Sequence, residues 1–123
     1  MNELILVVDD DPDQRRLLER VLHGAGYRVL TAPDGEAGIA TLSAVRPALV
    51  VLDVMMPKMN GFQTCRALRA LPEGAKLPVI MLTSKDQPAD RFWAEEVGAD
   101  AYLQKPVDVT LLLDTIAERL GAA

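Results

Sequence analysis

The sequence has little of the chemistry that builds disulfides, histidine-rich metal sites or nucleic-acid interfaces. Its 123 residues include one cysteine, Cys65, and one histidine, His23. A single cysteine cannot form an intramolecular disulfide, and a single histidine excludes a metal site built from several histidines. The formal net charge is -5, which disfavours direct binding to nucleic acid.

Membrane and nucleotide signals are also missing. No apolar run approaches the roughly 20 residues that a membrane-spanning helix needs. The N-terminal stretch MNELILVVDDD lacks a basic region followed by a long apolar segment. Neither G-x-x-x-x-G-K-[ST] nor G-x-G-x-x-G is present. We therefore predict a cytoplasmic protein with no membrane partner and no bound nucleotide.

The chain does contain apolar runs that alternate with helical patterns. Its length fits a single domain over residues 1–123. The predicted strands are Leu4–Val8, Arg28–Ala32, Ala48–Leu52, Leu77–Leu82 and Ala101–Leu103, and the predicted helices begin at Pro12, Gly35, Phe62, Pro88 and Val107. Regular alternation predicts an α/β fold, a parallel sheet with helices on both faces.

Three consecutive aspartates, Asp9 to Asp11, follow the first predicted strand. Asp11 can cap the helix that begins at Pro12. Polar residues also follow the third, fourth and fifth strands: Asp53, then Thr83 with Ser84, then Lys105. Ligands of open parallel sheets bind beyond the carboxyl ends of the strands, where the strand order reverses. With the order 2-1-3-4-5, Asp9, Asp10 and Asp53 would converge on one crevice.

Such a cluster is typical of a metal-assisted phosphoryl site. Crowded carboxylates repel one another unless a cation joins them, and oxygen ligands favour Mg²⁺. A nearby hydroxyl and ammonium, from Thr83 and Lys105, suit a phosphoryl group. Each residue alone also has a simpler interpretation, as a helix-start acid, a turn residue, a helix cap or a solvated lysine. Their coincidence at four strand ends favours the site.

Four motifs, VVDDDP, LDVMMPKMNG, VIMLTS and GADAYLQKP, together resemble the receiver domain of two-component response regulators over essentially the full chain. The segment DRFWAEEVGADAYL is similar to small receivers of twitching-motility pathways. The chain as a whole resembles a stand-alone, single-domain receiver of the chemotaxis or twitching-motility type. The resemblance implies the flavodoxin-like (βα)₅ doubly wound fold of the chemotaxis receiver, with a five-stranded parallel sheet of order 2-1-3-4-5.

The resemblance also assigns roles to residues. It implies that Asp53 is phosphorylated and that Mg²⁺ is bound directly by Asp10, by Asp53 and by the backbone carbonyl of Met55. Asp9 would act on the metal through water. Thr83 matches the switch hydroxyl, and Lys105 the lysine that binds the phosphoryl group.

The remaining implications concern the switch and its partners. Tyr102 matches the aromatic switch, and the bond between Lys105 and Pro106 is expected to be cis. A histidine kinase or phosphotransfer protein would be the donor. Phosphorylation would change the face built by the fourth helix, fifth strand and fifth helix, and so alter binding to an output protein. The chain would be a monomer or a phosphorylation-dependent dimer. Apolar Met55 and its counterpart Lys85 flank the site, and we predict slow self-dephosphorylation.

Two other classes of protein fit the sequence less well. A haloacid-dehalogenase-type phosphotransferase needs a second acid two residues after its nucleophile, but Val54 and Met55 follow Asp53. A flavodoxin-like cofactor carrier needs a glycine- and hydroxyl-rich loop where this chain has aspartates. We therefore expect a signalling protein rather than an enzyme. It could act alone or form part of a longer multidomain regulator.

Two further features have ordinary structural interpretations. Phe92 and Trp93 are adjacent on the fourth predicted helix, so one should point to the core and the other towards the surface. Packing is favoured over a role as a partner anchor. His23 is interpreted as an ordinary helix residue.

Overall fold

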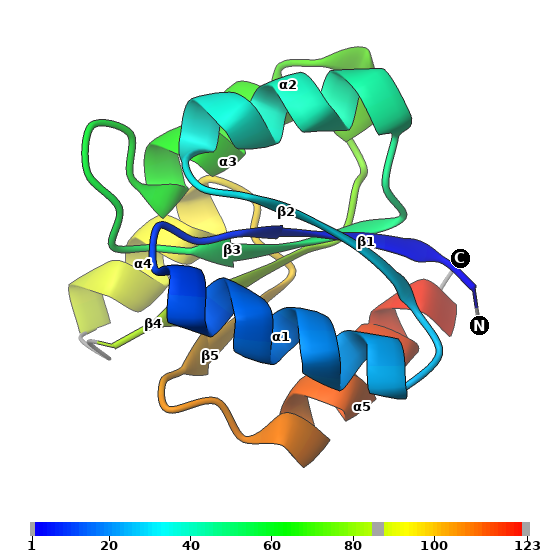
Figure 1. The fold of residues 1–123 in the computed structure, drawn as a ribbon. Coiled ribbons are helices and arrows are strands. Elements are labelled where there is room, and N and C mark those ends of the chain that lie inside the picture. The colour runs from blue at the N-terminus through cyan, green and yellow to red at the C-terminus, as the bar shows by residue number, and fades with distance from the viewer. Residues whose placement is uncertain (1, 85–87, 122–123) are drawn as a thin grey trace.

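A five-stranded parallel sheet forms the centre of the molecule, with helices on both of its faces (Figure 1). The structure is a computed structural model that describes residues 2–84 and 88–121. The strands are β1 (Leu4–Val8), β2 (Arg28–Ala32), β3 (Leu49–Asp53), β4 (Val79–Thr83) and β5 (Ala101–Gln104), in the order β2-β1-β3-β4-β5. The helices are α1 (Pro12–Gly24), α2 (Gly35–Val45), α3 (Gly61–Arg69), α4 (Pro88–Glu96) and α5 (Val109–Gly121). The predicted fold class and strand order are confirmed.

An apolar core lies on each face of the sheet, and a different set of helices covers each core. Side chains of α1 and α5 pack on one face of the sheet, against alternate residues of β1, β3 and β4. Side chains of α2 and α3, with Ala94 of α4 and Val97 just after it, cover the opposite face. Figure 1 shows α2 and α3 above the sheet and α1 and α5 below it. All residues of β3 and β4 are buried, as expected for central strands covered on both faces.

Side-chain caps mark the starts of α1, α2 and α3, and a similar contact precedes α5. Asp11 accepts a hydrogen bond from the backbone N–H of Asp13 at 2.9 Å, so its predicted capping role is confirmed. Asp34 caps α2, and Asn60 forms a reciprocal capping box with Gln63 at the start of α3. One of the three consecutive aspartates is therefore explained by the helix, which leaves Asp9 and Asp10 to be explained.

Several boundaries differ from the prediction by one or two residues. β3 and β4 begin later and end later than predicted, so Asp53 and Thr83 are the last residues of these strands. α5 begins at Val109 because Asp108 accepts a hydrogen bond from the N–H of Leu111 and stands before the helix. A short 3₁₀ helix at Pro72–Gly74 was not predicted. Within the described residues, no helix is long and apolar enough to cross a membrane.

The expectation for the two adjacent aromatics of α4 is wrong. Phe92 is 55% exposed and Trp93 is 47% exposed, and their rings meet edge to face at 5.5 Å. The inward face of α4 is occupied by Ala94, with Val97 just beyond the helix. Because successive helical residues are about 100° apart, positions 92 and 93 turn away from the sheet.

Cys65 is expected to resist alkylation in the native protein. Its side chain is fully buried and its thiol donates a hydrogen bond to the carbonyl of Val97 at 3.3 Å. Burial raises the thiol pKa to about 11, helped by Asp100 and opposed by Arg69. At pH 8 the thiolate fraction is then about a hundredfold lower than for an ordinary thiol.

Mass spectrometry after iodoacetamide treatment would measure this effect, with urea-unfolded protein as the reference. Equal rates in the two states would contradict the burial. The raised pKa also makes the free energy of unfolding depend on pH. Stability is highest below pH 9, where the thiol is protonated in both the folded and the unfolded protein. Stability falls as the pH rises towards 11, because the unfolded thiol ionises first.

Candidate functional site

Three carboxylates meet at the carboxyl edge of the sheet. Asp9 and Asp10 follow β1, and Asp53 ends β3, which lies beside β1 with Val8 opposite Leu52. One carboxylate oxygen from each aspartate lies within 4.8 Å of the others. Asp9 and Asp53 are buried, at 1% and 4% exposure, whereas Asp10 is exposed. The structure thus brings together the three acids that the sequence placed in one crevice.

Lys105 joins two of these acids from the end of β5. Its Nζ atom lies 2.9 Å from Oδ1 of Asp53 and 3.1 Å from Oδ2 of Asp9. The backbone N–H of Lys105 donates to the carbonyl of Thr83 at 2.6 Å, and the Lys105–Pro106 bond is cis, as predicted. One ammonium against three carboxylates leaves an excess of negative charge.

The pKa values of Asp53 and Lys105 are shifted by burial and by the contact between the two groups. Burial raises the pKa of Asp53 to about 6, and Asp9 and Asp10 act in the same direction, while the hydrogen bond from Lys105 opposes them. Burial alone would lower the pKa of Lys105, but the hydrogen bond and charge of Asp53, together with Asp9, outweigh it and raise that pKa. Lys105 therefore remains an ammonium beside a carboxylate that burial destabilises.

Asp9 is held by hydrogen bonds from Asp11, Lys105 and Arg15. The Oδ1 atom of Asp9 accepts the N–H of Asp11 at 2.9 Å, and its Oδ2 atom accepts from Lys105. Its backbone carbonyl accepts from Nη1 of Arg15 at 2.7 Å. Both oxygens of Asp9 are thus engaged within the protein. Sequence reasoning missed Arg15, because an arginine on α1 gives no sign of which carbonyl it will contact.

The loop after β3 is held closely against the sheet. The N–H of Val54 donates to the carbonyl of Leu82 at 2.9 Å, and Gly61 donates to the carbonyl of Val54 at 2.9 Å. A Cβ atom on Gly61 would lie 2.5 Å from the carbonyl oxygen of Asp53. The lack of a Cβ atom at Gly61 therefore lets the start of α3 approach the Asp53 backbone. Met55, in the same loop, is 51% exposed.

Thr83 and Tyr102 face the same side of the sheet. Tyr102 lies opposite Met81, and Thr83 follows Met81 by two residues, so their side chains point the same way. Thr83 is fully buried at the end of β4, next to Lys105. The guanidinium carbon of Arg91 lies 5.2 Å from the centre of the Tyr102 ring. Lys85, predicted to flank the site, lies outside the described residues.

Together these groups can stabilise an anion and supply a nucleophile. The cluster offers a carboxylate, a lysine ammonium beside it and a pair of acids, all at one edge of the sheet. Oxygen ligands with excess negative charge suit a hard divalent cation. A cation and an ammonium together suit phosphoryl transfer, in which catalysis depends mainly on charge stabilisation and positioning.

The sheet order and the position of the acids define the class to which the protein belongs, that of flavodoxin-like α/β domains whose site lies at the carboxyl ends of β1 and β3. Within this class, the sequence model of the response regulator receiver domain matches residues 5–117, and the chain belongs to this family. Receiver domains are signalling proteins rather than classical enzymes, receive phosphoryl groups from histidine kinases and bind Mg²⁺ in their acidic site.

Curated relatives include single-domain and longer proteins. The chain is 43% identical to protein PilH of Pseudomonas aeruginosa, covering 91% of this chain and 93% of PilH. It is 43% identical to the alkaline phosphatase synthesis transcriptional regulatory protein PhoP of Bacillus subtilis, covering 86% of this chain and 43% of PhoP. It therefore spans nearly all of PilH but less than half of PhoP.

Solved structures agree with the family. The chemotaxis protein CheY4 of Vibrio cholerae superposes with a TM-score of 0.92 at 33% identity, covering 96% of this chain and 98% of CheY4. The receiver domain of the sensor histidine kinase PA1611 from Pseudomonas aeruginosa has a TM-score of 0.92 at 28% identity, covering 99% of this chain and 100% of the other. That structure holds a magnesium ion in its active-site cleft.

The chain is thus a receiver that works in phosphorylation-dependent response-regulator signalling. The haloacid-dehalogenase alternative is not favoured.

Proposed function

We propose that residues 1–123 act as one receiver domain in which Asp53 accepts the phosphoryl group. The observation that supports this most directly is the position of Asp53, a nearly buried carboxylate 2.9 Å from the Lys105 ammonium and beside two further acids. Burial raises the pKa of Asp53 to about 6, so the residue is still mainly a carboxylate at neutral pH. The donor is a histidine kinase or a phosphotransfer protein.

The oxygen ligands of the acidic cluster fit Mg²⁺, with two carboxylates bound directly and the third through water. Asp10 is exposed and Asp53 ends the neighbouring strand, so both can offer an oxygen directly, together with the backbone carbonyl of Met55. Asp9 has both oxygens engaged by Asp11 and Lys105, which favours a contact through water. When bound, Mg²⁺ would offset the charge of the carboxylates and of the incoming phosphoryl oxygens.

The residues of the chain carry the transfer itself. An Asp53 oxygen attacks phosphorus, the new O–P bond forms as the P–N bond of the donor phosphohistidine breaks, and the electron pair returns to the imidazole nitrogen. Lys105 neutralises charge on the transferred group. Thr83 can then donate a hydrogen bond from its hydroxyl to a phosphoryl oxygen. In self-dephosphorylation, water attacks the phosphorus, the O–P bond to Asp53 breaks, inorganic phosphate leaves and Asp53 returns to a carboxylate.

The response reaches a distant surface through Thr83 and Tyr102. Both face the side of the sheet covered by α4, so movement of Thr83 towards the phosphoryl group would leave space for the Tyr102 ring. Tyr102 would then turn inward and change the face of α4, β5 and α5. This shifts the affinity for an output protein, with the chain as a monomer or a phosphorylation-dependent dimer.

Incubation with acetyl phosphate tests the function. With millimolar Mg²⁺, intact mass spectrometry should show the addition of one phosphoryl group, and excess EDTA should prevent it. Failure to gain mass with Mg²⁺ in a folded sample would overturn the proposal, as would equal gain in EDTA.

Self-dephosphorylation is expected to be slow. Met55 stands two residues after Asp53 and its exposed side chain has no group that could orient an attacking water. We expect the phosphorylated form to persist for minutes or longer after the donor is removed, followed by intact mass. Met55→Asn, which adds an amide at that position, should shorten the lifetime. A half-life of seconds in the unmodified protein would contradict the expectation.

A further inference from the structure

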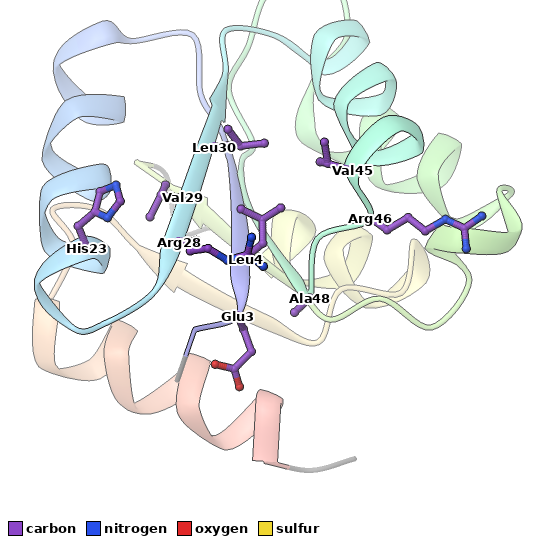
Figure 2. Close-up of a pocket in the computed structure, with 9 residues that line it drawn as sticks. All are labelled: Glu3, Leu4, His23, Arg28, Val29, Leu30, Val45, Arg46 and Ala48. Atoms are coloured by element: carbon purple, nitrogen blue, oxygen red, sulfur yellow. The ribbon is translucent and has the colours of Figure 1, made fainter.

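A groove of about 670 Å³ lies at the opposite end of the sheet from the acidic cluster. It is formed where β1 and β2 begin, at Leu4 and Arg28, and where α2 ends, at Val45. Figure 2 shows Leu4, Leu30, Val45 and Ala48 around the space between β2 and the end of α2. This volume is within the range of sites that bind ligands of drug-like size.

The floor of the groove is apolar and open. Leu30 is 39% exposed and Val45 is 42% exposed, although both are large aliphatic residues. Single exposed apolar residues are common on protein surfaces. Here Leu30 and Val45 line one groove together with Leu4 and Ala48, so the groove offers an apolar surface to an incoming apolar side chain.

The rim of the groove is positive, in contrast to the chain as a whole. Two cations, Arg28 and Arg46, line it against one carboxylate, Glu3, which has an interaction of its own. The whole chain carries a net charge of -5. Arg28 is anchored by a hydrogen bond of 2.9 Å from Nε to the carbonyl of Asn2.

Arg46 has an unusual backbone conformation. It ends α2 with φ of 49°, in the left-handed region that glycine or asparagine adopts more readily. An arginine there is strained relative to glycine, which lacks the Cβ atom that crowds this conformation. A charged side chain thus stands on the groove rim at a position where the backbone alone would favour glycine.

The neighbouring strand has an open edge. Among the described strands, β2 pairs with β1 alone. The N–H of Arg28 donates to Glu3, and the carbonyl of Ala32 accepts from Asp9, so the peptide groups of alternate residues face β1. Those of Val29 and Thr31 therefore face outward. Such an edge can pair with an extended segment of another chain.

We propose that this groove and the outer edge of β2 bind an extended, acidic and apolar segment of a partner protein. An aliphatic side chain of the segment would fit between Leu30 and Val45, and its carboxylates would face Arg28 and Arg46. A second copy of this chain fits less well, because pairing of two β2 edges would bring like charges together on two acidic molecules. The site is independent of Asp53, which lies at the other end of the sheet.

NMR titration of the ¹⁵N-labelled full chain tests the proposal. The probes are two short blocked peptides, one alternating glutamate with valine and the other alternating lysine with valine. The acidic peptide should shift the amides of Val29, Leu30, Thr31 and Val45 in a saturable way. It should bind at least about tenfold more tightly than the basic peptide, equivalent to about 1.4 kcal/mol.

Two variants and a control separate binding from folding. Arg46→Gly removes the guanidinium and relaxes the backbone, so it should keep the fold and weaken the acidic peptide about tenfold. Arg28→Glu should weaken it further. Arg66→Glu makes the same charge change as Arg28→Glu, but at an exposed position of α3 outside the groove. It should leave the affinity for the acidic peptide unchanged.

Each other result overturns the proposal. These results are equal affinity for the two peptides, unchanged binding by Arg46→Gly and Arg28→Glu, shifts confined to α4 and β5, and the same shifts with acetate alone. Concentration-dependent broadening of the β2 amides without peptide would instead indicate a second copy as the occupant. Binding that persists in Asp53→Asn is expected, so the outcome does not depend on the phosphorylation site.

Discussion

Asp53→Asn is expected to abolish phosphorylation by acetyl phosphate in the presence of Mg²⁺. The asparagine amide has nearly the same shape, but it is a poor nucleophile and offers the cation no negative charge. Intact mass spectrometry should show one added phosphoryl group on the unmodified chain and none on the variant. The variant should remain folded, because the substitution removes a buried charge whose ionised form is disfavoured there.

The matched control is Asp114→Asn, which makes the same chemical change on an exposed position of α5. It should be phosphorylated to the same extent as the unmodified chain. A phosphoryl group on Asp53→Asn, or its loss from Asp114→Asn, would show that another residue is the acceptor.

Arg69→Leu is expected to cause a large loss of stability for a residue so close to the surface. The Arg69 guanidinium donates to the carbonyls of Gly74, Leu77 and Gly98 at 2.8, 2.6 and 2.6 Å, and to Asp100 at 3.1 Å. It thus joins the end of α3 to the segments that lead into β4 and β5. Asp100 in turn accepts the N–H of Val79 at 2.8 Å.

Leucine would leave these acceptors without their cationic donor and cost about 3–5 kcal/mol. For a domain of this size, the melting temperature should fall by roughly 10 °C or more, measured by circular dichroism. Arg66→Leu, on an exposed position of the same last turn of α3, should change it by only a few degrees. Similar melting temperatures for the two variants would show that the hydrogen bonds of Arg69 do not stabilise the fold.

The course of the chain was predictable from local patterns. Apolar runs identified the strands, and Asp11 before Pro12 identified the start of α1, because both signals depend on neighbouring residues only. The convergence of Asp9, Asp10 and Asp53 was also predictable, since parallel strands bring their carboxyl ends to one edge. These features follow from periodicity and topology.

Contacts with distant backbone groups were not predictable. Arg69 binds three carbonyls from two separate segments, and Arg15 binds the carbonyl of Asp9. Gly61 is needed for its lack of a Cβ atom next to Asp53. The orientation of Phe92 and Trp93 was predicted wrongly, because the inward side of α4 is set by which residues meet the sheet.

Magnesium binding to the unphosphorylated protein tests the central claim most directly. The claim is that Asp10 and Asp53 crowd together at one point and that a divalent cation relieves their repulsion. Isothermal titration calorimetry should show one Mg²⁺ site in the millimolar range for the unmodified chain, and a much weaker site for Asp10→Asn. No uptake at millimolar Mg²⁺, or equal uptake by the two proteins, would contradict the account.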